Sequence, residues 1–339
     1  RRNGVTGTER GGDPVEHLRL QLEAARDAGS SVWGCLQDGT LPGWYVHDER
    51  GHADERSRRY HWARYVESAG ELFGDLVHGW LPVHEPTRWA ARGWLEGARP
   101  PGLRDDAEAF AATLEGAHLA SVEAALRLRG GGRPVTSAQR MTPVFPARDQ
   151  PDLPPTPDAE AMTSAVDETL HGCWLRMLDE ETLVVPGRPP VDVPGAREAF
   201  DVVGITYRHA AAVRGDGALL RYPQALPAGI DGSVPWAEGL AISLHRVAEA
   251  LPGRPLLVAG YGLATADEDQ RERYLRDGLG VAAEAVSDGM PLQGFWWQEP
   301  IDGPGHPAAP GLFDRDRTPR PAAALFASVA TGGDIPTAG

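Results

Sequence analysis

The feature that most constrains the fold is a regular alternation of helical and strand-like segments, which is clearest in the last third of the chain. Residues 240–251 carry apolar side chains at helical spacing, and an apolar, strand-like run follows at residues 255–259. A charged helical segment at 268–286 and an apolar run at 292–297 repeat this order. Because each crossover helix returns the chain in the same direction, the strands are predicted to pair in parallel.

The first two thirds of the chain alternate in the same way. Helices are predicted over residues 14–28, 60–73 and 106–128, and strands over 31–36, 77–83, 142–146 and 201–207. Residues 148–158 contain four prolines and are predicted to form a loop. Since no repeat of fixed period is present, the sequence predicts one α/β domain over residues 1–339.

Composition narrows the partners that we expect. A chain of 339 residues with 41% hydrophobic residues can bury a full core, and its net charge of −15 disfavours nucleic acid. No apolar stretch is long enough to cross a bilayer, and with only two cysteines a reducing cytoplasm is the expected compartment. No His or Cys cluster has metal-ligand spacing, so neither a metal nor another cofactor is expected. Nothing in the sequence indicates an oligomeric state.

Short motifs follow the predicted strands. They are W-L-P-V-H-E-P at 80–86, T-P-V-F-P-A at 142–147, D-V-V-G-I-T-Y at 201–207 and D-E-D-Q-R-E-R-Y-L at 267–275. In this order they resemble glycoside hydrolase family 1, the retaining β-glucosidase type, from about residue 14 to residue 328. The resemblance implies a (β/α)8 TIM barrel with its active site at the carboxyl ends of the strands. The family's first two strands would precede Arg1, so we expect upstream residues that this sequence lacks.

The resemblance also implies roles for single residues and shows where the chain departs from the family. Glu85 keeps the place of the general acid/base, but His84 replaces the family's asparagine. The nucleophilic glutamate is replaced by Gly260. A sugar-binding histidine corresponds to Asp38, and the tyrosine that supports the nucleophile corresponds to Arg208.

The family's glycone-gripping run after the last strand is reduced here to residues 298–303. Gln298 and Glu299 remain candidates for substrate binding because they follow that strand, and Tyr207 is a candidate because it ends an earlier one. Trp296 and Trp297 alternate along the strand, so only one of them is expected to face the substrate, and Trp297 is our candidate.

These departures change the chemistry that is possible. Retaining hydrolysis needs two carboxyl groups, and Gly260 cannot attack an anomeric carbon. Glu85 could still protonate a leaving hydroxyl, and His84 could be the second proton-transfer group. We therefore predict elimination of water from a natural-product intermediate, a polyketide-like or glycosidic small molecule. In type this resembles the glycosidase-like dehydratases found in antibiotic biosynthesis, such as that of tirandamycin.

Alternative interpretations stay open at this point. An inverting hydrolase needs only a second carboxylate that activates water, and Asp38 or Glu299 could serve. A non-catalytic barrel that binds a ligand is the third possibility. Glu85 could simply cap the next helix. Asp38 and Arg208 could form no more than an ion pair.

Overall fold

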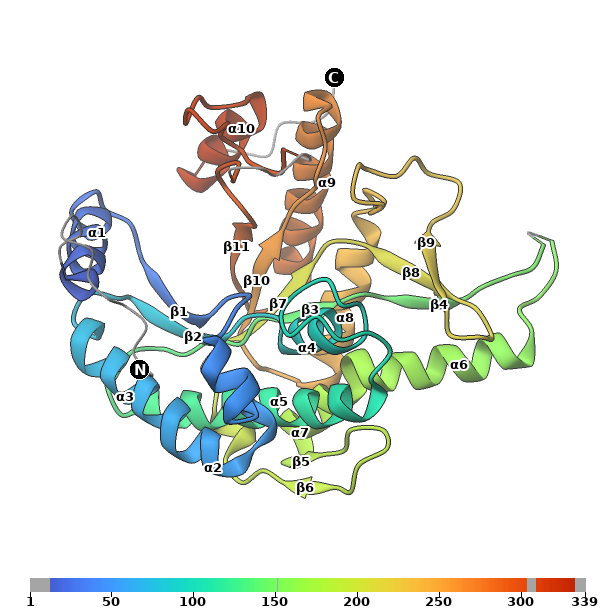
Figure 1. Ribbon diagram of the computed structural model, residues 1–339. Helices are drawn as coiled ribbons and strands as arrows, with labels where there is room; N and C mark the ends of the chain where they lie inside the picture. Colours follow the sequence, from blue (N-terminus) through green and yellow to red (C-terminus); the bar gives the residue numbers. More distant parts are fainter. Residues whose placement is uncertain (1–12, 151, 304–308, 333–339) are drawn as a thin grey trace. The chain divides into compact units, whose positions relative to one another are not determined.

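The computed structural model describes residues 13–150, 152–303 and 309–332. The chain divides into two compact units, which we describe one at a time (Figure 1). Unit 1 comprises Arg1–Gln139 and Arg176–Val202, and unit 2 comprises Arg140–Leu175 and Val203–Gly339. Within the described residues, no helix has the length and apolar character needed to cross a bilayer.

Unit 1 contains the first strands and the helices that follow them. Its elements are α1 (Pro14–Asp27), β1 (Trp33–Gln37), η1 (Trp44–Asp48), η2 (Gly51–Ala53), α2 (Glu55–Ser57), η3 (Arg58–Trp62), α3 (Ala63–Phe73), β2 (Gly79–Val83), α4 (Pro86–Trp94), α5 (Ala107–Arg129), β5 (Thr182–Leu183), β6 (Val191–Asp192) and η5 (Ala196–Glu198). The predicted helices at 14–28, 60–73 and 106–128 and the strands at 31–36 and 77–83 are confirmed to within a few residues.

The first strands of unit 1 are parallel, whereas β5 and β6 pair antiparallel. β1 and β2 pair from Trp33 opposite Gly79 to Gln37 opposite Val83. Parallel bridges continue from β2 to the segment at 135–138 and from that segment to Val202. All five residues of β2 are buried, which explains why the strand reads as an unbroken apolar run.

Unit 2 contains the remaining strands. Its elements are β4 (Val144–Pro146), α6 (Pro157–Asp167), η4 (Glu168–Gly172), β7 (Val203–Tyr207), β8 (Ala210–Val213), β9 (Leu219–Tyr222), α8 (Glu238–Ala250), β10 (Leu256–Tyr261), α9 (Glu268–Ser287), β11 (Leu292–Trp297) and α10 (Pro321–Ala330). β3 (Gln139–Met141) begins in unit 1, and α7 (Cys173–Glu180) crosses the later boundary.

The main sheet of unit 2 has the order β11-β10-β7-β3, and β10 pairs in parallel with both β7 and β11. Two details differ from the sequence prediction. An antiparallel hairpin, β8–β9, follows β7, and the predicted strand at 142–146 pairs with β8. β8 consists of three alanines and a single β-branched residue, Val213, and this weak strand signal explains why it was not predicted. Helix α6 begins at Pro157, inside the predicted loop at 148–158, of which residue 151 lies outside the described residues.

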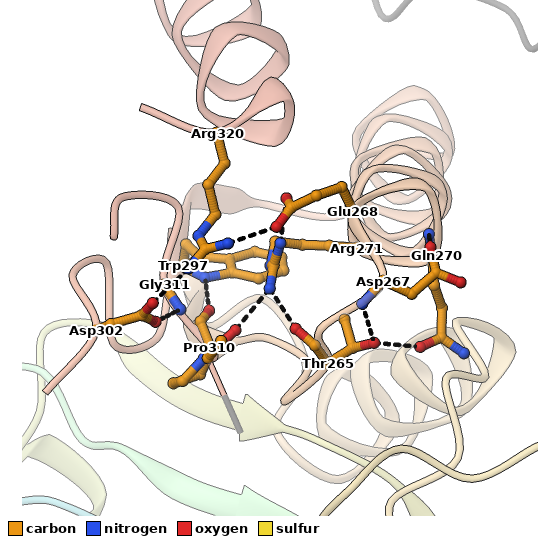
Figure 2. A network of polar contacts seen from close by, with 11 residues as sticks. Thr265, Asp267, Glu268, Gln270, Arg271, Trp297, Asp302, Pro310, Gly311 and Arg320 are labelled. Carbon is orange, nitrogen blue, oxygen red and sulfur yellow. Dashed lines mark hydrogen bonds and ion pairs between the residues drawn. The ribbon is translucent and has the colours of Figure 1, made fainter. Parts of the chain in front are cut away.

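A polar network in unit 2 joins α9 and α10 to the segment after β11 (Figure 2). The fully buried Arg271 guanidinium donates to the Glu268 carboxylate, to the Thr265 carbonyl and, at 2.6 Å, to the Ala309 carbonyl. Arg320 donates to the other oxygen of Glu268 and to Asp302 at 2.5 Å. Figure 2 shows both guanidinium groups directed at Glu268. The network thereby ties the start of α10, through Arg320, to Glu268 of α9 and to Asp302.

We expect Asp302 to make the unit sensitive to acid. Burial raises the pKa of this carboxyl, but the Gly311 N–H, at 2.7 Å, and Arg320 outweigh that effect and lower the pKa overall. A lowered pKa stabilises the fold above the unfolded value of about 4, and this stabilisation is lost as the pH falls through the folded value.

Asp302→Asn should therefore lower the urea midpoint at neutral pH, and its deficit relative to the unmodified chain should shrink at about pH 3. Asp316→Asn, at an exposed position, is the matched control and should change neither midpoint. An Asp302→Asn deficit that is the same at both pH values would contradict the prediction.

Candidate active site

In unit 1, three predicted site residues meet at the ends of two paired strands. Asp38 follows β1, and His84 and Glu85 follow β2. Because Gln37 is paired with Val83, the next residues along each strand, Asp38 and His84, are brought side by side. His84 Nδ1 lies 3.1 Å from Asp38 Oδ1. The His84 hydrogen bond is the largest cause of the lowered pKa of Asp38, and the nearby charge of Glu85 acts in the opposite direction.

The protonation of the pair follows from this geometry. An ionised carboxylate can only accept a hydrogen bond, so the imidazole hydrogen lies on His84 Nδ1. In the neutral imidazole, Nε2 then carries the lone pair. Asp38 thus fixes which nitrogen of His84 can take up a proton.

Glu85 has an unusual backbone. Its φ of 49° and ψ of 58° lie in the left-handed region, which costs a residue with a side chain about 1–2 kcal/mol. The conformation is held by two hydrogen bonds: Glu85 N–H donates to Ala138 O at 2.7 Å, and Trp89 N–H donates to Glu85 O at 2.8 Å. The side chain is only 6% exposed and makes no capping hydrogen bond to α4. The helix-cap interpretation therefore does not account for Glu85, and strain of this kind is typical of functional positions.

A buried chain of polar side chains lies beneath Asp38, and the sequence did not predict it. Tyr45 hydroxyl lies 3.0 Å from His52 Nδ1, and His52 Nε2 lies 2.6 Å from Gln37 Oε1. Burial lowers the pKa of His52 to about 3, so this imidazole is neutral and donates to Gln37. Gln37 O in turn accepts the His84 N–H at 2.9 Å. The sequence feature that could have indicated these buried contacts is Gln37, a polar residue that ends β1 directly before Asp38.

In unit 2, the predicted residues Arg208, Gln298 and Glu299 form a second cluster. Arg208 follows β7, and the other two follow β11. Arg208 Nε donates to Gln298 Oε1 and Nη2 to Glu299 Oε2, each at 3.1 Å. Asp38 is thus paired with His84 in unit 1, and Arg208 is paired with Gln298 and Glu299 in unit 2.

Gly260, the position of the lost nucleophile, lies within β10 next to this cluster. A Cβ atom at this position would lie 3.0 Å from Thr206 Cγ2 and 3.4 Å from Gln298 Oε1. The contact with Thr206 is tighter than usual for a Cβ atom, and the contact with Gln298 is an ordinary van der Waals distance. The packing favours glycine here independently of any catalytic argument.

Two aromatic candidates have structural roles. Tyr207 is fully buried, and its hydroxyl donates to Trp236 O at 2.6 Å, which does not fit the predicted contact with substrate. The last residue of a strand can face either side of a sheet, and the sequence could not decide between them. Trp297 is 6% exposed and its indole N–H donates to Pro310 O at 3.0 Å, so its role in substrate binding stays a prediction.

Introducing a carboxylate at position 260 should not restore hydrolysis. We expect negligible release of nitrophenol from aryl β-glucosides by the unmodified chain and by Gly260→Glu. The substitution should also destabilise the fold by about 1–3 kcal/mol in urea unfolding, because Thr206 must move.

Gly280→Glu in α9 is the matched control for stability, since a Cβ there would meet nothing within 4 Å. It should leave the stability unchanged or raise it by up to about 1 kcal/mol, because glycine is a poor helix former. Strong nitrophenol release by the unmodified chain or by Gly260→Glu would contradict the prediction for position 260.

The site residues do not form a metal centre. Among the residues that the structure describes, no group of three or more His, Cys, Asp or Glu side chains is placed to hold a metal ion.

Comparison with known proteins gives the fold. No family model matches the sequence, and neither does any curated protein. Solved structures do match: the AHE enzyme from Alicyclobacillus herbarius is 20% identical, with 94% of this chain and 78% of that chain covered and a TM-score of 0.79. A family 1 β-glucosidase from Thermotoga maritima is 18% identical, with 94% and 77% covered and a TM-score of 0.79. A β-glycosidase from Pyrococcus horikoshii is 20% identical, with 97% and 78% covered and a TM-score of 0.81. The predicted fold class is confirmed: this is the (β/α)8 fold of family 1 glycoside hydrolases.

Proposed function

We propose that this chain, which has the fold of family 1 glycoside hydrolases, is an enzyme that removes water from a small natural-product intermediate. The observation that carries the proposal is the cluster in unit 1, where the strained Glu85 adjoins the hydrogen-bonded pair of Asp38 and His84. A hydrolase of the retaining type would need a carboxylate at position 260, where the chain has glycine.

The proposed step uses both groups. Glu85 in its acid form donates a proton to a hydroxyl of the substrate, which leaves as water. His84 Nε2 takes a proton from the adjacent carbon, and the electron pair of that C–H bond becomes the new double bond. Asp38 stabilises the imidazolium that forms, because its carboxylate accepts from Nδ1–H. Glu85 regains its proton and His84 loses one through solvent, so the net reaction is substrate to alkene plus water.

The proposal is tested in the organism that carries the gene. A strain in which the chromosomal gene encodes Glu85→Gln should accumulate a compound that is heavier than the normal product by one molecule of water. Mass spectrometry of culture extracts detects it, and the purified, unmodified protein should convert it into the product. Accumulation of a glycoside in its place would favour hydrolysis and contradict elimination.

Hydrolysis by an altered mechanism is the second candidate, and the β-glucosidase fold relatives favour it. It would use Asp38 or Glu299 as the base that activates water. Asp38 is already engaged by His84, and Glu299 by Arg208, which makes both poorer bases for this task. A ligand-binding barrel without activity is the third candidate. The strained backbone at Glu85 fits either role, and the acid next to the hydrogen-bonded pair of His84 and Asp38 favours an enzyme.

A further inference from the structure

Arg208 is a nearly buried cation at the end of β7. Its side chain is 10% exposed, although it carries a full charge. A charge in such surroundings requires hydrogen-bond acceptors and a counter-charge, because water solvates it poorly. The N–H groups of the guanidinium that lack a partner in the protein therefore indicate what the side chain can bind.

One edge of the guanidinium is held by the protein. Nε donates to Gln298 and Nη2 to Glu299, so two neighbours after β11 fix the plane of the group. Gln298 is itself fixed, since its N–H donates to Tyr261 O at 2.8 Å. The main chain of Arg208 is held as well, since the Tyr274 hydroxyl donates to the Arg208 carbonyl at 3.3 Å. The guanidinium is thus oriented before any ligand arrives.

The other edge is open. Among the residues that the structure describes, Nη1 of Arg208 has no hydrogen-bond partner, and it is not one of the enclosed side-chain atoms. Nη1 is therefore accessible, and with the second hydrogen of Nη2 it forms a planar fork of two N–H groups. Such a planar fork matches the two oxygens of a carboxylate, which it binds with two parallel hydrogen bonds.

The counter-charge is incomplete. Within the described chain, Glu299 is the acid that forms an ion pair with Arg208, through a single contact, and its side chain is 44% exposed. The neighbouring position 260 carries no side chain, and Gln298 offers only a neutral amide oxygen. We propose that the open edge of Arg208 binds the carboxylate of a small carboxylic acid.

Binding of benzoate and of its neutral, nearly isosteric analogue benzamide to the full chain tests the proposal by isothermal titration calorimetry. We expect saturable binding of benzoate and much weaker binding of benzamide. Arg208→Gln should weaken benzoate binding about tenfold to hundredfold, the range for a charge-assisted hydrogen bond. Arg214→Gln, at an exposed arginine of the same unit, should leave it unchanged.

Glu299→Gln gives a prediction of the opposite sign and retains Arg208. Removing the neighbouring negative charge should tighten benzoate binding about twofold to fivefold. The proposal is overturned if benzamide binds as well as benzoate, if Arg208→Gln keeps the affinity, or if Glu299→Gln weakens it. Glu85→Gln, in the other unit, separates the two proposals. If that variant keeps full turnover while benzoate binding still depends on Arg208, the proposed mechanism fails and the carboxylate site stands.

Discussion

Turnover of the natural substrate should fall about a hundredfold to ten-thousandfold when Glu85 is replaced by Gln, the range for lost general acid–base catalysis. The amide keeps the shape of the side chain and removes its titrating proton. The left-handed backbone and the two hydrogen bonds that hold it should be unaffected, since they use main-chain atoms of Glu85. Affinity for the substrate should therefore change little, and the loss should appear in kcat, which steady-state kinetics measures.

The control is Glu71→Gln, an exposed glutamate of α3 in the same unit, which should leave kcat unchanged. His84→Ala should reduce kcat as strongly as Glu85→Gln if the imidazole removes the carbon-bound proton. A small effect of His84→Ala together with a large effect of Glu85→Gln would leave Glu85 as the proton carrier and assign the base to another group. Full activity of Glu85→Gln would refute the mechanism.

Replacing Arg271 by Met should destabilise the protein by about 3–5 kcal/mol, the usual cost of removing one partner from a buried ion pair. The side chain is fully buried, and its loss would leave the carbonyls of Thr265 and Ala309 without this donor. The midpoint of urea unfolding, followed by circular dichroism, measures the effect.

Arg273→Met is the matched control, since Arg273 is an exposed arginine of the same helix and the change alters helix propensity equally. The free energy of unfolding of this variant should stay within about 0.5 kcal/mol of the value for the unmodified chain. Equal effects of the two substitutions would show that the network of Figure 2 contributes little to stability.

The sequence predicted most of the fold because the central strands are fully buried. β2, β7 and β10 are buried along their whole length, and such strands appear in a sequence as continuous apolar runs between helices. β3 was missed because it reads Gln-Arg-Met, and its polar residues are accommodated by tertiary contacts such as the 2.8 Å hydrogen bond from Gln139 to Thr87. A local pattern cannot contain that information.

The candidate site was predicted as a set of residues but not as an arrangement. Asp38, His84 and Glu85 were selected by the resemblance of their motifs to those of family 1 glycoside hydrolases, at positions that follow predicted strands. The hydrogen bond between the first two depends on the register of β1 against β2, which is set by pairing in space. The backbone of Glu85 depends on a carbonyl at Ala138, more than fifty residues along the chain.

The left-handed backbone at Glu85 has an evolutionary consequence. Glycine adopts this conformation without strain, so a mutation to glycine at this position would relax the fold while removing the acid. Selection for folding and selection for activity therefore favour different residues at a single codon. A lineage that had lost the proposed reaction would be free to drift toward glycine at this position.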